Sequence, residues 1–318
     1  MFQKVCIIGF GLIGSSVARA IHKADLAKEI VCSDLSQDVC DKVMELGLAN
    51  YATPNLQEAV TGADLVIMAV PVRQSAAIAA SIKDHLAQDA IITDVGSVKE
   101  SVIEDVSVHL PDHVHFVPAH PIAGTEYSGP EAGFAELFEN RWCILTPPPE
   151  VDIRAVEKIT LMWEAFGARI EIMDAKRHDM VLGMTSHLPH LIAYTIVGTA
   201  VDLEDHMQDD VISFSAGGFR DFTRIAASDP VMWRDIFLTN KDSVLELLQR
   251  FNEDLTALQR AIRNDDGDFL QQFFAHTRHV RRQIIDRGQA NYPRSPIGSK
   301  RYTPRSQPRD KKSGSLSE

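Results

Sequence analysis

Hydrophobic residues in the first half of the chain alternate between short runs typical of buried strands and longer stretches with helical periodicity. The strand-like runs, rich in Val and Ile, are Lys4–Ile8, Ile30–Asp34, Asp64–Val70, Ala90–Asp94, Val114–Val117, Trp142–Thr146 and Ala168–Met173. The amphipathic stretches between them are Ile13–Lys23, Gln37–Leu46, Gln74–Leu86, Val98–Leu110 and Ile153–Phe166. Nearly continuous apolar strands that alternate with helices predict a parallel sheet covered by helices on both faces.

After about Asp174 the strand-like runs almost disappear and the pattern becomes helical. The stretch Val181–Val201 is interrupted at Pro189 and is apolar on too many sides for a simple surface helix. We therefore expect it to be buried, either within its own domain or against another subunit. Val231–Arg263 and Phe269–Arg287 follow as amphipathic helices with charged outer faces.

These patterns predict two domains and a tail. Residues 1–173 form the α/β domain, and residues 174–288 form the helical domain, with Gly288 as a helix stop and Pro293 just beyond it. Residues 289–318 are basic, contain several Pro and Ser and have few apolar side chains, so we expect them to be disordered. This segment has two possible roles, a solvated tail or an arm that recognises a partner.

Composition narrows the classes of protein that fit. A net charge of −12 argues against a general binder of nucleic acid or of anionic membranes. No apolar run approaches about 18 residues and no basic, cleavable leader is present, so we expect neither a membrane-spanning helix nor a signal peptide. The four cysteines, Cys6, Cys32, Cys40 and Cys143, are scattered, which favours free thiols in a cytoplasmic protein.

A glycine-rich turn joins the first strand to the first helix. Its sequence is Gly9-Phe10-Gly11-Leu12-Ile13-Gly14. Gly9 permits the tight turn, Gly11 lets a diphosphate approach the backbone, and Gly14 lets the helix pack closely on the strand. The free N–H groups at the start of this helix would bind the diphosphate. Gly9, Gly11, Leu12, Ile13 and Gly14 are therefore predicted to bind a dinucleotide.

Asp34 ends the second strand and is predicted to select NAD over NADP. Its carboxylate would accept hydrogen bonds from the adenine ribose and would repel a 2′-phosphate. A helix cap is the alternative role for Asp34, although Ser36 could also supply that cap. Val70 and Pro71 end a later strand and are predicted to line the same cofactor site, since ligands lie beyond the carboxyl ends of parallel strands.

His120 is the leading candidate for catalysis. It lies in a loop predicted between Pro118 and Gly124, where Pro118 and Pro121 would hold the backbone stiffly. Histidine exchanges protons near neutral pH. Ser97 follows the preceding strand, so both side chains are expected at the nicotinamide side of the sheet.

Four segments occur in one order that resembles the prephenate/arogenate dehydrogenase family of tyrosine biosynthesis. They are Asp94-Val95-Gly96-Ser97-Val98-Lys99, His120-Pro121-Ile122-Ala123-Gly124-Thr125-Glu126, Ser186-His187-Leu188-Pro189-His190 and Gly217-Gly218-Phe219-Arg220-Asp221-Phe222-Thr223-Arg224. The resemblance extends from Val5 to about Arg287. It implies a Rossmann-type domain followed by an all-α dimerisation domain, of the 6-phosphogluconate-dehydrogenase-like class, and a homodimer. It also implies oxidative decarboxylation of prephenate or arogenate with NAD.

The resemblance also implies roles for individual residues. His120 would accept the proton of the substrate's ring hydroxyl. Ser97 would bond this histidine and bind the cofactor by helping to place nicotinamide and substrate. Arg224 would bind a substrate carboxylate and His190 would lie near the substrate's side chain, with Gly217 and Trp233 lining or supporting the pocket. As a neutral base, His120 would make the rate fall below an apparent pKa of about 6–7.

Arg220 and the pair His187/His190 each have two possible roles. Arg220 could join Arg224 in binding the second carboxylate, or it could pair with Asp221 at the surface. The pair His187-x-x-His190 has the spacing of metal ligands, but no third ligand completes a recognisable set, so no metal is expected.

Two other functions compete with this one. A 3-hydroxyacid-type NAD dehydrogenase would use a catalytic lysine in the helical domain, where the chain offers Lys176 and then Lys241. A non-catalytic dinucleotide-binding regulator would need the glycine turn but would not need Ser97, His120 and Arg224 together. The sequence does not decide between prephenate and arogenate.

Overall fold

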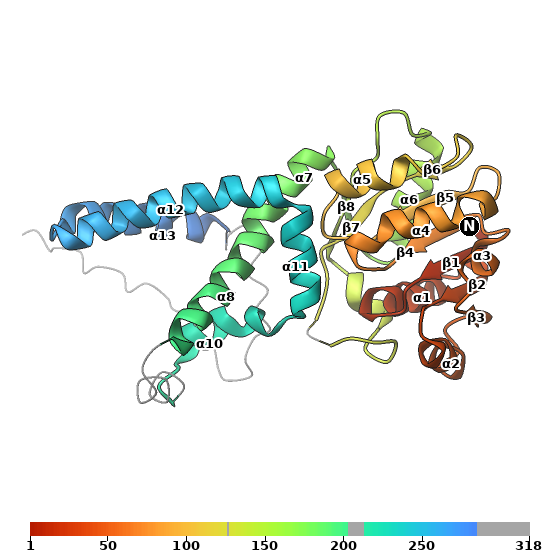
Figure 1. The fold of residues 1–318 in the computed structure, drawn as a ribbon, viewed down its shortest axis with the longest axis horizontal. Helices are drawn as coiled ribbons and strands as arrows, with labels where there is room; N and C mark the ends of the chain where they lie inside the picture. The colour runs from red at the N-terminus through yellow and green to blue at the C-terminus, as the bar shows by residue number, and fades with distance from the viewer. Residues whose placement is uncertain (126, 203–212, 285–318) are drawn as a thin grey trace, which may run out of the picture. The chain divides into compact units, whose positions relative to one another are not determined.

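The computed structural model describes residues 1–125, 127–202 and 213–284 (Figure 1). The chain divides into two compact units, Met1–Asn252 and Glu253–Glu318. The predicted border between residues 173 and 174 lies inside the first unit and stays a prediction. The predicted tail, 289–318, and the predicted helix stop at Gly288 lie outside the described residues.

A parallel sheet forms the centre of the first unit. Within the described residues it has six strands in the order β3-β2-β1-β4-β5-β6. The strands are β1 (Phe2–Ile8), β2 (Ala27–Ser33), β3 (Tyr51–Thr53), β4 (Leu65–Met68), β5 (Ile91–Asp94) and β6 (His115–Phe116). All five pairings are parallel, as the alternation of apolar strands and helices predicted. The short strand β3 is the one that the hydrophobic pattern did not reveal.

The two faces of the sheet are buried in different cores, because successive side chains of a strand point to opposite faces. On β1, Val5 and Ile7 belong to one core, whereas Cys6 and Ile8 belong to the other. The first core receives α1 (Leu12–Ala24), α2 (Gln37–Glu45) and α6 (Ile153–Ala165). The second receives α3 (Leu56–Val60), α4 (Ser75–Ile82) and α5 (Glu100–Ser107). Burial on both faces explains why these strands read as continuous apolar runs.

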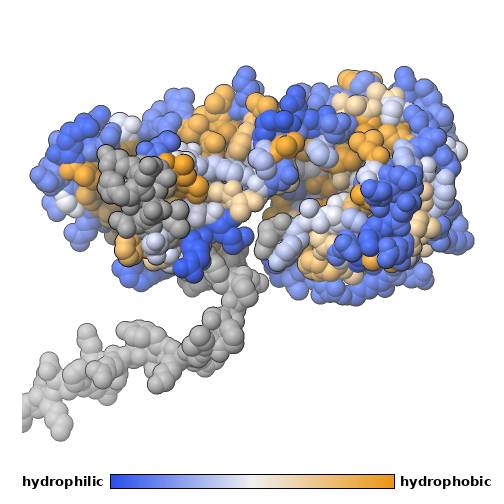
Figure 2. Space-filling view, turned by 60° about the horizontal axis from the view of Figure 1, so that its bottom comes forward, coloured by the Kyte–Doolittle hydropathy of each residue, from blue (hydrophilic) through white to orange (hydrophobic). Residues whose placement is uncertain are grey.

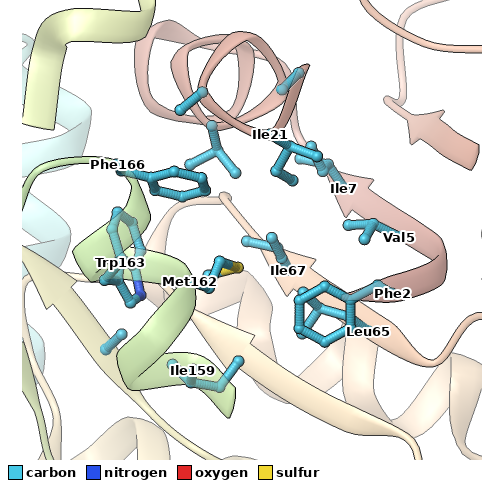
Figure 3. Packing of buried hydrophobic residues seen from close by; sticks show 14 of the residues in the cluster. Phe2, Val5, Ile7, Ile21, Leu65, Ile67, Ile159, Met162, Trp163 and Phe166 are labelled. Atoms are coloured by element: carbon cyan, nitrogen blue, oxygen red, sulfur yellow. The ribbon is translucent and has the colours of Figure 1, made fainter. Parts of the chain in front are cut away.

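A cluster of aromatic rings around Trp163 of α6 forms part of the first core (Figure 3). Trp163 meets Phe138 edge-to-face with ring centroids 5.1 Å apart, and it meets Phe166 in the same way at 5.4 Å. The close-up shows Met162 beside Ile67 of β4, with Trp163 on the other side of Met162. Helix α6 thereby covers β1 and β4 on this face of the sheet.

His120 lies in a strand, not in the predicted loop. Strand β7 (Ala119–Pro121) pairs antiparallel with β8 (Trp142–Leu145), which pairs parallel with β9 (Arg169–Ile172). The loop was predicted because prolines flank His120, and that prediction was wrong. A proline is tolerated in an edge strand, and β7 is an edge strand of this three-stranded sheet. His120 is therefore held by a sheet as well as by its flanking prolines.

The long apolar stretch begins earlier than predicted and is interrupted before Pro189. It consists of α7 (Ala175–Leu182), a π-helical turn η4 (Gly183–His187) and α8 (Leu188–Val201). Pro189 lies in the first turn of α8, where a missing N–H costs no helical hydrogen bond. The chain therefore accommodates Pro189 by a local change in winding, a feature common near functional sites.

The predicted helix Val231–Arg263 is two helices. After α10 (Gly217–Thr223) and the 3₁₀ turn η5 (Arg224–Ala227) come α11 (Pro230–Thr239) and α12 (Lys241–Arg263). They are separated at Asn240, whose side chain is buried and bonded to other segments. The prediction of a single helix was therefore wrong. The apolar stripe continues from α11 into α12, so the hydrophobic pattern does not show that the helix is interrupted.

The second unit contains the end of α12 and α13 (Gly267–Ile284), both amphipathic. A turn joins them, with Asp265 in the left-handed region at φ 52°. Aspartate tolerates this conformation better than most residues. The predicted second helix of this pair, Phe269–Arg287, thus starts two residues earlier, and its last residues lie outside the description.

Helix α8 carries apolar side chains that the described residues leave largely uncovered. Only Leu188 and Ala193 of this helix are buried, whereas Ile196 is 39% exposed. Apolar patches also interrupt the hydrophilic surface in the space-filling view (Figure 2). By length and composition alone, Ala175–Val201 is apolar enough to cross a membrane, with 28% of its most apolar window buried. Polar residues interrupt this segment, so it contains no continuous apolar run of about 18 residues in the sequence.

Candidate functional site

The glycine turn has the backbone geometry of a dinucleotide-binding loop. Gly9 adopts φ 89°, and a Cβ added there would lie 2.5 Å from the Ala69 carbonyl oxygen. A Cβ on Gly14 would lie 2.0 Å from the Gly9 carbonyl oxygen. A Cβ on Gly11 would meet nothing within 4 Å. Gly9 and Gly14 are thus required by the fold itself, whereas Gly11 leaves open space in front of the backbone.

The start of α1 is free to bind an anion. Gly11 is its N-cap and supplies no side-chain acceptor, so the first N–H groups of Leu12 and Ile13 face outward from the helix end without a cap. The positive end of the helix dipole adds to this preference for negative charge. The residues present therefore fit the diphosphate of a dinucleotide.

Asp34 is oriented by backbone groups, and a neighbouring residue caps the helix that follows. Its two carboxylate oxygens accept hydrogen bonds from the N–H groups of Phe10, at 3.0 Å, and Ser36, at 3.1 Å. The Ser36 hydroxyl caps α2 by accepting from the Val39 N–H. Since Ser36 supplies that cap, the remaining lone pairs of Asp34 are available for ribose hydroxyls.

The later strands bring the other predicted cofactor residues to the same edge. Strands β1, β4 and β5 are neighbours, so the segments after their carboxyl ends lie side by side. The Val70 side chain lies 3.0 Å from the Cβ position of Gly9, and Pro71 is exposed just beyond it. Ser97 follows β5 and is half-buried. The glycine turn, Val70 and Ser97 thus share one edge of the sheet.

A buried ion pair holds the backbone beside His120. The Lys99 ammonium and the Asp94 carboxylate pair directly, and both side chains are almost completely buried. Lys99 Nζ donates to the Ala119 carbonyl at 2.9 Å, and Asp94 Oδ1 accepts from the Ala119 N–H at 3.2 Å. The pair therefore clamps both polar groups of the residue before His120.

The His120 side chain is bonded to a histidine that the sequence analysis did not select. Its Nδ1 lies 2.9 Å from Nε2 of His178, which belongs to α7. Among the described residues, no hydrogen bond joins His120 to Ser97. The bond to Ser97 implied by the family resemblance is therefore absent here, and α7 supplies the partner of His120 instead.

Asp179 connects this pair to the nucleotide-binding part of the unit. Its Oδ1 accepts from His178 Nδ1 at 2.7 Å and from the Lys99 N–H at 2.8 Å, and its Oδ2 accepts from the Glu100 N–H at 2.9 Å. Asp179 thus caps α5 from another helix, where the helix dipole favours a negative charge. A single carboxylate orients His178 and fixes α7 against α5.

Asn240 and His187 extend the network. Asn240 donates from Nδ2 to the Asp179 carbonyl at 2.9 Å and to His187 Nδ1 at 3.0 Å. Because His187 Nδ1 accepts this bond, a neutral His187 carries its proton on Nε2, which is buried without a partner in the described structure. A buried donor without a partner is costly unless a ligand satisfies it.

The predicted substrate-side residues His190 and Trp233 lie together. Their rings stack with centroids 3.6 Å apart, and His190 donates from Nδ1 to the Ser186 carbonyl at 2.8 Å. Trp233 Nε1 is a second buried donor without a partner in the described structure. Trp233 also packs against Val98, next to Ser97. These contacts bring the substrate-side pair to the loop after β5.

Arg224 lies close enough to His190 to lower its pKa, whereas Arg220 is directed elsewhere. Burial is the larger cause of the lowered His190 pKa, and the Arg224 charge adds to it. Arg220 donates to the Ser215 carbonyl at 3.2 Å and is exposed. The two arginines occupy different elements, α10 and η5, and Gly217 begins α10. The structure thus favours Arg224 over Arg220 as the anion anchor.

Burial keeps the histidines of the site neutral. It lowers the pKa of His120 well below the ordinary value, with additional repulsion from His178, Lys99 and His187. The pKa of His178 is also lowered, mainly by burial, although Asp179 opposes the shift. Burial lowers the pKa of His187 to about 4. A neutral imidazole can accept a proton, so the arrangement suits base catalysis.

Sequence reasoning missed the residues that position His120. They are Asp94, Lys99, His178, Asp179 and Asn240. The only signal available was the ionisable pair His178-Asp179 itself, which follows the charged Lys176 and Arg177 and precedes three apolar residues of the helix. A buried ionisable pair needs partners, but this pattern does not show that the pair is buried. What the sequence could not indicate was that α7 packs against β7 and α5.

Comparison with known proteins places this architecture among enzymes of one family. The family described as prephenate dehydrogenase, nucleotide-binding domain, matches residues 17–172, and prephenate dehydrogenase, dimerization domain, matches residues 174–276. A cyclohexadienyl dehydrogenase of Zymomonas mobilis is 44% identical over 88% of this chain and 96% of its own length. A prephenate dehydrogenase of Bacillus subtilis is 34% identical over 88% of this chain and 76% of its own length.

A solved structure agrees with these relatives. Prephenate dehydrogenase from Aquifex aeolicus, in complex with hydroxyphenyl propionate and NAD+, superposes with a TM-score of 0.83 at 34% identity. The match covers 89% of this chain and 99% of that one. The α/β domain followed by a helical domain, predicted from the hydrophobic pattern, is therefore confirmed.

Proposed function

The chain belongs to the prephenate dehydrogenase family, and we propose that it catalyses the NAD-dependent oxidative decarboxylation of prephenate, of arogenate, or of both, in tyrosine biosynthesis. The observation that carries this proposal is the buried His120, which is linked by hydrogen bonds through His178, Asp179 and Asn240 to His187. The His187 ring contacts Trp233, which stacks on His190. NAD supplies the acceptor for the hydride that leaves the ring carbon.

The protein's own residues have three tasks in this reaction. Gly11 and the start of α1 hold the diphosphate, and Asp34 accepts the ribose hydroxyls. Arg224 presents a rigid fork to a substrate carboxylate. His120 takes the proton of the ring hydroxyl and must not return it, because protonating that hydroxyl would promote loss of water instead.

The competing functions fit less well. A hydroxyacid-type dehydrogenase would need a lysine in the helical part, but Lys176 and Lys241 are both exposed side chains. The buried lysine, Lys99, is engaged by Asp94 and by the Ala119 carbonyl. A dinucleotide-binding regulator would have no need for a buried, neutral His120 or for unpaired donors on His187 and Trp233.

Formation of NADH from NAD with prephenate, and separately with arogenate, tests the proposal. We expect ultraviolet absorbance of NADH to appear with at least one of them, and His120→Asn to abolish it while NAD binding persists. The ratio of kcat/KM for the two substrates assigns the preference. NAD binding without turnover of either substrate would contradict the proposal and favour the regulator.

We also propose a cytoplasmic homodimer, formed through the helical domain at residues 174–288. The uncovered apolar face of α8 and the family description of a dimerization domain support it. Light scattering should give twice the mass of the chain, and Ile196→Glu should shift it toward the monomer. Ile153→Glu, at another exposed apolar side chain, is the matched control and should leave the mass unchanged. A monomeric parent protein would contradict this assembly.

A further inference from the structure

Three buried side chains form a hydrogen-bonded chain that ends at His120. Asp179 Oδ1 lies 2.7 Å from His178 Nδ1, and His178 Nε2 lies 2.9 Å from His120 Nδ1. His178 and Asp179 are at most 1% exposed, and His120 is 9% exposed. The chain joins α7 to β7, which are 58 residues apart at the two histidines.

The protons in this chain can be placed by elimination. An ionised carboxylate only accepts hydrogen bonds, so His178 Nδ1 carries a proton. The Nε2 atom of a neutral His178 is then an acceptor, so His120 Nδ1 carries the proton of the second bond. A neutral His120 is left with a bare Nε2. The chain of bonds therefore selects the one tautomer of His120 that can accept a proton at that atom.

We propose that His178 is a positioning residue that fixes this tautomer of His120 and then takes up the proton that His120 displaces. The proposal rests on the proposed function. The substrate hydroxyl proton passes to His120 Nε2, and the Nδ1 proton of His120 passes to His178 Nε2. His178 becomes the imidazolium beside the Asp179 carboxylate. No electrons change hands in these two transfers, and His120 ends neutral with its proton on Nε2.

Electrostatics favour His178 over His120 as the resting place of the charge. His120 is repelled by Lys99, His178 and His187, which makes an imidazolium there costly. His178 faces Asp179 and Asp94 as attractive charges, with Lys99 as the opposing cation. Asp179 is itself held by the N–H groups of Lys99 and Glu100 at the start of α5. A carboxylate in direct contact stabilises an adjacent cation more than a distant one does.

Two substitutions separate positioning from proton uptake. In His178→Gln the side-chain oxygen can still accept from His120 Nδ1, but it cannot take up a proton. In His178→Leu both functions are lost. We expect kcat to fall about 10- to 100-fold in His178→Gln and further in His178→Leu, with KM changed less than about threefold. The exposed His85→Gln is the matched control and should retain the parent kcat.

Nitrogen NMR of the histidines in the protein without ligands gives an independent readout. We expect the parent protein to show His120 protonated at Nδ1 and bare at Nε2, and His178→Leu to lose this preference. His120 protonated at Nε2 would overturn the inference even if the enzyme turns over prephenate. A His178→Gln variant with the kcat of His85→Gln would also overturn it. The tautomer is measured without substrate, so it can be determined even if the protein turns over neither prephenate nor arogenate.

Discussion

The cofactor end and the catalytic end of this site are built in different ways. At the cofactor end, Gly9, Gly11 and Gly14 lie within one turn, and the backbone itself forms the binding surface. At the catalytic end, His120 depends on Lys99 and His178, which arrive from separate segments of the chain. A local motif therefore describes the first end, whereas packing of distant elements creates the second.

This difference sets what a substitution can do. A change at Gly9 or Gly14 alters backbone geometry directly, so the fold and cofactor binding are affected together. A change at the catalytic end leaves the sheet in place and alters one hydrogen bond or one charge. Substitutions at the two ends should therefore differ in whether they change stability, cofactor binding or catalysis.

Gly14→Ala should be the most damaging change. Its Cβ would lie 2.0 Å from the Gly9 carbonyl oxygen, a backbone atom that cannot move alone. We expect a destabilisation of about 1–3 kcal/mol together with loss of NAD binding. Gly11→Ala is the control, since its Cβ meets open space, and it should keep the parent Tm but bind NAD more weakly. Thermal melts measure the stability of the two variants, and NAD titrations measure their affinity. An equal Tm for Gly14→Ala and Gly11→Ala would contradict this prediction.

Arg224→Gln should raise the KM for prephenate or arogenate by about 10- to 100-fold, because a charge-assisted bond to a carboxylate is lost. Arg220→Gln is the matched control and should change KM by less than about threefold, since Arg220 is exposed and bonded to Ser215. Steady-state kinetics at saturating NAD measure both. If the two variants behave alike, Arg224 is not the anchor.

Asp34→Ser should weaken NAD binding about tenfold and reduce the discrimination against NADP, because the repelling carboxylate is gone. Asp38→Ser, on the exposed first turn of α2, removes the same charge without touching the predicted ribose site. Titration with each dinucleotide gives the ratio of affinities. A ratio unchanged from the parent protein would remove Asp34 from this role.

The pH dependence should show the smallest effect. Only neutral His120 can accept a proton, and burial places its pKa well below the ordinary 6.5. As pH falls, kcat/KM should therefore stay on its plateau through 6.5 and decline only at lower pH, below the range of about 6–7 predicted from sequence. NAD affinity measured over the same range serves as the control. A decline centred on the ordinary histidine range would show that His120 is more hydrated than its burial here implies.

The interruption between α11 and α12 is a feature that the hydrophobic pattern could not predict. The apolar stripe of Val231–Arg263 continues through Asn240, so periodicity alone predicts one helix. The reason for the break is tertiary, since Asn240 leaves the helix to bond Asp179 and His187. In the same way, Pro118 and Pro121 indicated a loop around His120, and only pairing with β8 made it a strand.

The sequence by itself determined the parallel sheet, the glycine turn and the identity of His120 as the catalytic candidate. These follow from local chemistry: strand and helix periodicity, the absence of Cβ atoms, and the proton affinity of imidazole. Only the tertiary structure decided which nitrogen of His120 is left free to accept a proton. That choice depends on Asp179 and His178, because a tautomer is selected by the hydrogen bonds of distant partners and not by neighbours in the chain.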